Sequence, residues 1–261
     1  MLPNEDAVPR CLKLLLPLLA AATVGAAAAP ARADEAHWRD LESRIQYGYY
    51  TEDARALQQV ADELAQDDSH EKYRGYYAAL ADWRLALLGP PAAGARGPSV
   101  AQRVAHCAHE LDGVLASQPD FAPAFTLRAA CGATPAGGGL HVPFTGPNPG
   151  RDIERALALS PRDPRTLFVD GLIDYELGAA AGGNRERALP QLRKAVAAFE
   201  VERAGAEPLP GWGAAEAYCY LARDLLDHGD GVGARDALEH ALLLAPDYTQ
   251  ARRLMARITR G

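Results

Sequence analysis

Three cysteines are the residues best suited to covalent chemistry: Cys107, Cys131 and Cys219. Cys107 lies about twelve residues before the helix-breaking pair Pro119-Asp120, and Cys131 about eleven or twelve residues after it. In an antiparallel helix pair, equal distances from the turn bring two residues to the same level. Because a disulfide needs Cα atoms about 4.4–6.8 Å apart, both cysteines must face the seam between the helices. We predict a Cys107–Cys131 disulfide; the alternative is two small buried residues that never pair.

The other candidate metal-binding, phosphate-binding and catalytic motifs each lack residues that they need. His106 and His109 share one face of a predicted helix and could bridge a metal, but zinc needs further ligands in tetrahedral geometry. The glycine-rich stretches at 137–139 and 182–183 lack the Gly-Lys pair of a phosphate-binding loop, and no nucleophile elbow or H-E-x-x-H motif occurs. Cys219 has no neighbouring histidine, so we expect a semi-buried thiol. We therefore predict no catalytic residue, no metal, no cofactor and no enzymatic activity.

The first 33 residues have the pattern of a secretory signal peptide. Arg10 and Lys13 precede an apolar run from Leu14 to Ala29, and Ala31-Arg32-Ala33 fits the small-residue cleavage rule. The run is short and rich in Ala and Gly for a spanning helix. We predict a signal peptide over 1–33, export to the bacterial periplasm, and no stable membrane insertion afterwards. An uncleaved anchor helix is the alternative.

The composition is that of a folded, acidic protein. The 261 residues are 48% hydrophobic and carry a net charge of −7. An acidic chain without a Lys/Arg-rich block is a poor match for nucleic acid, whose binding proteins carry basic patches. The abundance of alanine favours helices and their close approach.

Three segments repeat one pattern, in which an apolar helical stretch ends at a proline and a second helix follows. They lie at 111–124, 153–166 and 238–251. Their prolines, Pro119, Pro161 and Pro246, are separated by one and two periods of about 42 residues. Proline ends a helix because its ring and missing N–H cannot continue the hydrogen-bond ladder. The spacing predicts a chain of helix pairs.

The last repeat, from Ala215 to Tyr248, is the most regular. Small residues in it let two helices touch, larger ones fill the seam, and His228-Gly229-Asp230 forms the turn. Eight positions carry this pattern: Tyr218, Leu221, Ala222, Leu225, Ala234, Leu238, Ala241 and Pro246. In length and pattern the segment resembles a tetratricopeptide repeat (TPR), a helix–turn–helix unit of 34 residues.

The same template fits four earlier ranges with longer turns: 35–68, 70–121, 122–163 and 164–205. In the first of them, Glu42 stands where the family has a small residue. The resemblance implies an all-α fold in the domain 34–261: a right-handed TPR-like α-α superhelix, or solenoid. It would comprise about five helix pairs, the last at 215–248, closed by a capping helix at 249–260.

The resemblance also implies a function. The segments YRGYYAAL and WGAAEAYCYLAR are similar to those of exported bacterial TPR proteins of unassigned biochemistry. TPR helices form a concave groove for peptides, although the long loop at about 132–150 could tuck back and block it. The groove positions carried over to this chain are Arg39, Gln46, Tyr47, Tyr175, Glu176, Arg223 and Asp227.

We therefore predict a non-enzymatic periplasmic scaffold or adaptor that binds a partner protein or an extended peptide in this groove. The alternative is a ligand-handling accessory protein of envelope transport, with a small-molecule cavity.

Overall fold

The computed structural model describes residues 28–67, 72–91, 96–135, 148–177, 183–203 and 209–260. These residues form eleven α-helices and no strand. The helices are α1 (Ala28–Tyr50), α2 (Ala54–Gln66), α3 (Lys72–Leu88), α4 (Val100–Ser117), α5 (Ala122–Gly132), α6 (Pro149–Leu159), α7 (Pro164–Glu176), α8 (Arg185–Arg203), α9 (Ala214–Asp227), α10 (Gly231–Leu244) and α11 (Thr249–Ile258). The all-α prediction is confirmed for this part of the chain. The predicted cleavage point after Ala33 lies within α1, and the core of the loop at 132–150 lies outside the described residues.

Short polar residues and prolines set the helix boundaries. The Asp53 carboxylate accepts hydrogen bonds from two backbone N–H groups at the start of α2, and Ser99 and Gln102 form a capping box on α4. At the other end, α4, α6 and α10 each stop two residues before one of the three repeat prolines. The local sequence thus explains where these helices begin and end.

Small residues let paired helices approach closely. Gly171 of α7 is buried against α8, and a Cβ built on it would lie 3.0 Å from Leu192 Cγ and 3.1 Å from the Leu192 backbone nitrogen. Such contacts are tighter than packed side chains accept. Glycine at this position therefore allows the backbones of α7 and α8 to come together.

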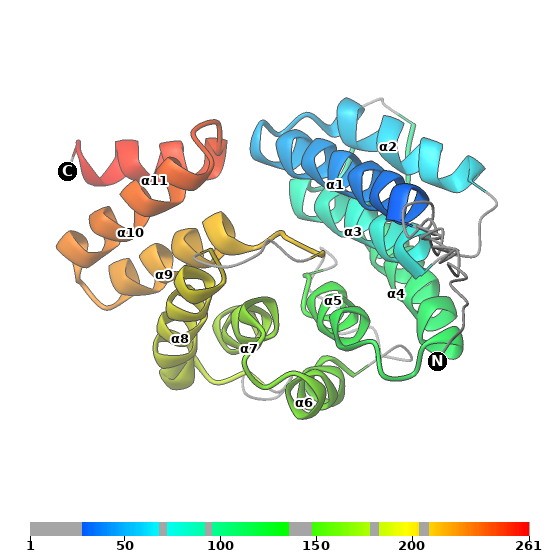
Figure 1. Cartoon of the computed structure of the whole chain (residues 1–261). Coiled ribbons are helices and arrows are strands. Elements are labelled where there is room, and N and C mark those ends of the chain that lie inside the picture. Colours follow the sequence, from blue (N-terminus) through cyan, green and yellow to red (C-terminus); the bar gives the residue numbers. More distant parts are fainter. Residues whose placement is uncertain are drawn as a thin grey trace, which may run out of the picture.

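The helices form two curved layers. Figure 1 shows α1, α3, α5, α7 and α9 on the inner side of the curve and the even-numbered helices α2 to α10 on the outer side. Neighbouring inner helices contact one another along the series from α1 to α9. A shared core between successive pairs is how repeat proteins gain the stability that one pair lacks.

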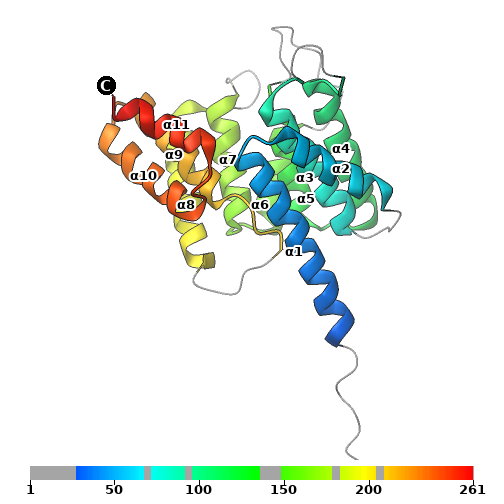
Figure 2. The ribbon, with the colours of Figure 1, turned by 90° about the horizontal axis from the view of Figure 1, so that it is seen from above.

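The closing helix α11 meets the first helix pair. Arg253 of α11 donates to Glu52 in the α1–α2 join, with Nη1 2.8 Å from Oε2. The rings of Tyr49 and Tyr50, at the end of α1, lie 5.9 and 4.8 Å from the ring of Tyr248. Figure 2 shows the N-terminal part of α1 extending beyond the other helices, whereas its C-terminal part lies among them. The described helices thus form a closed curve instead of an open arc.

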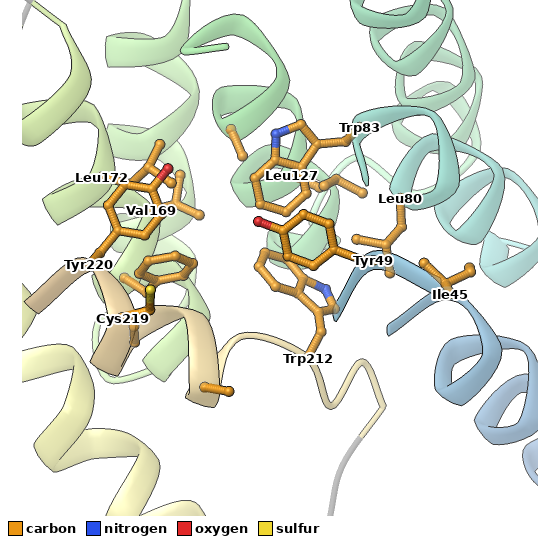
Figure 3. Close-up of a cluster of buried hydrophobic side chains, with 14 of the residues drawn as sticks. Ile45, Tyr49, Leu80, Trp83, Leu127, Val169, Leu172, Trp212, Cys219 and Tyr220 are labelled. Atoms are coloured by element: carbon orange, nitrogen blue, oxygen red, sulfur yellow. The ribbon is translucent and has the colours of Figure 1, made fainter. Parts of the chain in front are cut away.

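An aromatic core fills the middle of this curve. Trp83, Tyr49 and Trp212 lie together there, with Leu80 and Ile45 on one side and Val169, Leu172 and Tyr220 on the other, as Figure 3 shows. Trp212 belongs to the segment 209–213, the α8–α9 linker, which enters the centre from the C-terminal half. Gly213, with φ of 112°, ends the linker against Phe199, where a Cβ would lie 3.0 Å from Cζ.

A disulfide joins two helix pairs. Cys107 of α4 and Cys131 of α5 are bonded, with Cα atoms 6.5 Å apart and both side chains fully buried. The third described cysteine, Cys219, is a buried free thiol. No helix in the described ranges is both long and apolar enough to cross a lipid bilayer.

Removing this disulfide with the double variant Cys107→Ala and Cys131→Ala is expected to lower the free energy of unfolding by about 2–4 kcal/mol. The bond closes a loop of about 24 residues in the unfolded chain. Urea denaturation measures the loss, and the mass of protein alkylated in denaturant, with and without reductant, identifies the bonded pair. A bond from Cys219 to either partner would contradict this structure.

The side chain of Asp224 in α9 is fully buried, and neither carboxyl oxygen accepts a hydrogen bond within the described structure. Burial raises the pKa of this carboxyl. The ionised form therefore destabilises the folded state at neutral pH, and this penalty disappears as the pH falls below the unfolded-state pKa of about 4.

Asp224→Asn is thus expected to unfold at higher urea concentration than the wild type at pH 7, and at the same concentration near pH ~3.5. Asp236→Asn, an exposed change on α10, is the control and should have no effect at either pH. A loss of stability at pH 7 would show instead that the contact between Asp224 Oδ1 and His228 Nδ1, at 3.4 Å, outweighs the burial.

Candidate functional site

The inner face of the curve is closed around a buried ion pair. Arg84 of α3 donates to Glu216 of α9, and both residues are 1% exposed. Gln46 and Tyr50 of α1 complete what we call the Arg84–Glu216 network. Gln46 Oε1 accepts from Arg84 Nη2 at 3.0 Å, and Tyr50 Oη donates to Glu216 Oε2 at 2.8 Å. The network ties α1 and α3 to α9 across the centre of the molecule.

Aromatic rings enclose the guanidinium group of the network. The Cζ atom of Arg84 lies 4.3 Å from the ring centre of Tyr49, 4.4 Å from that of Trp83 and 5.2 Å from that of Trp212. Cation–π contacts of this kind strengthen when water is excluded. The α8–α9 linker provides one of these rings, and its Trp212 Nε1 donates to Tyr76 Oη at 2.8 Å.

The expectation that Gln46 faces an open groove is therefore wrong. Gln46 is half-buried and hydrogen-bonded to Arg84 and Glu216, because the α8–α9 linker and α9 cover the inner side of α1. Glu42, the departure from the repeat pattern, explains part of this closure. Its carboxylate accepts from the backbone N–H of Gly211 in the linker at 2.8 and 3.0 Å, and from Tyr77 Oη at 2.8 Å. Burial raises the pKa of Glu42, and these hydrogen bonds act against that rise.

Four of the predicted residues come together at the ends of α7 and α9. Tyr175 Oη donates to Asp227 Oδ2 at 2.9 Å, and Arg223 Nη1 donates to Glu176 Oε1 at 3.0 Å. Arg185, at the start of α8, joins them, since its Nη2 lies 2.6 Å from Asp227 Oδ2. The guanidinium carbons of Arg185 and Arg223 lie 3.9 and 4.8 Å from the centre of the Tyr175 ring. We call these five residues the Tyr175 cluster; it is half-buried to exposed.

The other two predicted residues lie elsewhere on α1. Tyr47 is 61% exposed. Arg39 pairs with Glu35, Nη2 to Oε1 at 2.7 Å, and lines a cleft of about 530 Å³ between α1, the start of α7, the end of α8 and the start of α9. The cleft is lined by Arg39, Glu42, Ser43, Arg165, Phe199, Glu200, Glu202, Leu209, Gly211, Ala214, Tyr218 and Leu244. This cleft was not predicted from the sequence, because its lining residues belong to different repeat units and to the linker between two of them.

A smaller cavity, of about 370 Å³, lies where the closing helix α11 meets the first helix pair and the end of α3. Tyr49, Leu87, Leu88 and Tyr248 form its apolar part, and the Glu52–Arg253 ion pair lies at its edge. Nowhere in the described ranges do three His, Cys, Asp or Glu side chains converge into a metal site. His106 instead contacts the Asp82 carboxylate.

Cys219 is placed for packing and not for nucleophilic chemistry. Its side chain is fully buried near Tyr248, and burial raises the pKa of its thiol to about 12. Thiolate, the reactive form, is therefore scarce at neutral pH. We expect a disulfide reagent at about pH 8 to leave Cys219 unmodified in the folded protein and to modify it fully in urea. Stoichiometric reaction of the folded protein within minutes would contradict this burial.

Comparison with known proteins identifies the fold. The structure is similar to the crystal structure of a thermophilic TPR protein from Thermus thermophilus, with a TM-score of 0.54 and 16% sequence identity. The match covers 87% of this chain and 100% of that chain. No family model matches the sequence, and no curated protein does. At this level of identity the likeness shows a TPR-like helical fold.

Proposed function

We propose that this protein is a non-enzymatic interaction scaffold that binds a partner protein or an extended peptide. A TPR-like fold suggests protein interaction in general, since its stacked helices present rigid side chains over an extended surface. The observation that carries the proposal is the Tyr175 cluster. In this proposal the partner binds at the Tyr175 cluster and not at the inner face around the Arg84–Glu216 network.

The cluster has the composition of an interaction hot spot. Tyr and Arg are enriched among residues whose truncation weakens protein interfaces most. Here the Tyr175 ring lies against two guanidinium groups, and Glu176 and Asp227 hold those groups in place. Side chains that are already ordered lose little conformational entropy on binding. The cluster therefore offers a partner a preorganised aromatic and charged surface.

We also propose that the protein acts after export, in the bacterial periplasm. The signal-peptide pattern at 1–33 supports this location, and so does the Cys107–Cys131 bond, because disulfides persist in oxidising compartments. Cell fractionation and N-terminal sequencing of the exported form test it. A reduced, cytoplasmic protein with an intact N-terminus would overturn it.

Crosslinking and affinity purification from the cell envelope, followed by mass spectrometry, test the scaffold. We expect one reproducible protein partner that is lost from the double variant Tyr175→Ala and Arg223→Ala. The matched control is Arg235→Ala with Glu239→Ala, which removes an exposed ion pair on α10. Loss of the partner from both double variants, or from neither, would overturn the assignment to the Tyr175 cluster.

The cleft beside Arg39 favours a second candidate function, ligand handling in envelope transport. Its volume of about 530 Å³ lies within the range of about 300–1,000 Å³ usual for small-molecule sites. The smaller cavity has no comparable set of buried charges among its described lining residues. Co-purification of a small molecule in stoichiometric amount, with no protein partner, would favour this function over the scaffold.

A further inference from the structure

Arg185 lies on the exposed side of the Tyr175 cluster. Its Cζ atom is 3.9 Å from the centre of the Tyr175 ring, so this ring covers one face of the guanidinium group. Both terminal nitrogens are also in use, because Nη1 donates to the Tyr175 carbonyl oxygen at 2.9 Å and Nη2 donates to Asp227 Oδ2 at 2.6 Å. The Arg185 side chain is nevertheless 47% exposed. Its exposed part therefore includes the face of the guanidinium group opposite Tyr175.

The rest of the cluster holds this guanidinium group in place. Rings and guanidinium groups alternate in contact along the series Tyr220, Arg223, Tyr175 and Arg185. Tyr220, the first member, is buried, so the series is anchored in the core. Asp227 fixes the last two members, since it accepts from Tyr175 Oη as well as from Arg185. A partner would therefore meet a group that is already ordered, which lowers the entropic cost of binding.

The charges around the open face do not favour an acidic partner. Arg185 pairs with Asp227, and Arg223 pairs with Glu176, so the two positive charges are balanced. A carboxylate from a partner would also approach the half-exposed Asp227 beside Arg185 and be repelled. A guanidinium group is weakly hydrated and stacks on aromatic rings. An aromatic side chain can therefore cover the open face without breaking an ion pair.

We infer that the partner of the scaffold is an extended peptide segment with a Trp or Tyr side chain that stacks on the face of Arg185 opposite Tyr175. Arg185 is then enclosed between two rings, one from each protein. Cation–π contacts strengthen when water is excluded, and Trp, Tyr and Arg are enriched in interface hot spots. This inference rests on the proposed scaffold function and adds the chemistry of the partner to it.

Peptide selection followed by a double-mutant cycle tests the inference. A phage-displayed library of random dodecapeptides is panned on the purified protein, and phage that also bind the Tyr175→Ala, Arg223→Ala variant are removed. We expect the selected peptides to share an aromatic residue at one position. Isothermal titration calorimetry then compares one selected peptide with a version that has Leu in place of this residue. Both peptides are titrated into the wild type and into Arg185→Lys.

Arg185→Lys keeps the positive charge beside Asp227 and removes the planar face. We expect it to weaken binding of the aromatic peptide by about five- to thirty-fold, because the contact excludes water, and to change binding of the Leu peptide much less. The four affinities separate the contact between Arg185 and the peptide ring from a general loss of binding. Arg235→Lys, an exposed change on α10, is the control and should leave both affinities unchanged.

The contrary results separate this inference from the scaffold proposal. Selected peptides that share acidic residues instead of an aromatic one would overturn the inference and leave the scaffold standing. An equal effect of Arg185→Lys on both peptides would do the same. If no peptide prefers the wild type to the Tyr175→Ala, Arg223→Ala variant, the cluster binds no extended segment. The assignment of the scaffold to the Tyr175 cluster and the inference would then fail together.

Discussion

Glu216→Ala is expected to lower the free energy of unfolding by about 3–5 kcal/mol, because it leaves the buried Arg84 guanidinium without its carboxylate. Arg84 would keep only Gln46 as a hydrogen-bond acceptor among the residues described around it. Urea denaturation followed by circular dichroism measures the loss. The control is Glu239→Ala, whose exposed ion pair with Arg235 contributes about 0.3–0.5 kcal/mol at most.

A compensating double variant distinguishes a missing partner from a general loss of packing. Arg84→Met with Glu216→Leu removes both charges and keeps apolar volume. Replacing a buried ion pair in this way is often neutral or stabilising. We expect the double variant to recover most of the stability that Glu216→Ala loses. If Glu216→Ala unfolds at the same urea concentration as Glu239→Ala, the ion pair does not close the centre of the protein.

Trp212→Ala is expected to cost about 3–5 kcal/mol, the range for truncating a buried aromatic side chain. Trp212 is 2% exposed and packs edge-to-face on Trp83, with ring centres 5.3 Å apart. Its loss also frees the α8–α9 linker from Tyr76 and uncovers the aromatic rings around Arg84. Denaturation in urea measures the cost. Acrylamide quenching of the fluorescence of the two remaining tryptophans, measured in a Trp38→Phe background so that only Trp83 reports, measures the exposure of the centre.

Trp212→Phe is the matched variant. It keeps an aromatic ring against Trp83 but removes the indole N–H that donates to Tyr76 and part of the ring volume, so its cost should be smaller, about 1–3 kcal/mol. Equal costs for Trp212→Ala and Trp212→Phe would show that the hydrogen bond, and not the ring, holds the linker in place.

The helices were predictable because their signals are local. Pro119, Pro161 and Pro246 each follow a helix end, and small residues such as Ala222 and Ala234 are buried where the repeat template puts them. The Tyr175 cluster was partly predictable for the same reason, because residues of α7 and α9 occupy equivalent positions of successive units. Arg185 was not predicted as part of the cluster, because it lies at the start of α8, after a turn that is longer than the one in the repeat template.

The closed centre was not predictable from these signals. Arg84 and Glu216 are 132 residues apart, and nothing in either local sequence indicates the other. The segment 209–213 lies between the predicted units 164–205 and 215–248. The repeat pattern therefore predicts no packing contact for Trp212. Glu42 was a usable signal: a carboxylate in place of a small residue on an inner helix calls for hydrogen-bond donors, and the linker backbone supplies one.

The contact between the closing helix α11 and the first helix pair changes how the protein should unfold. In a linear repeat array each unit touches only its neighbours, so units at an end can open separately. Here Glu52 and Arg253 meet across 201 residues of sequence, and Tyr50 and Glu216 across 166. Loss of α11 therefore removes a contact with the α1–α2 join as well as the contacts with α10. The stability of this chain cannot be divided among its units, so it should unfold in one cooperative transition, and a shortened version should lose more than the deleted unit contributes.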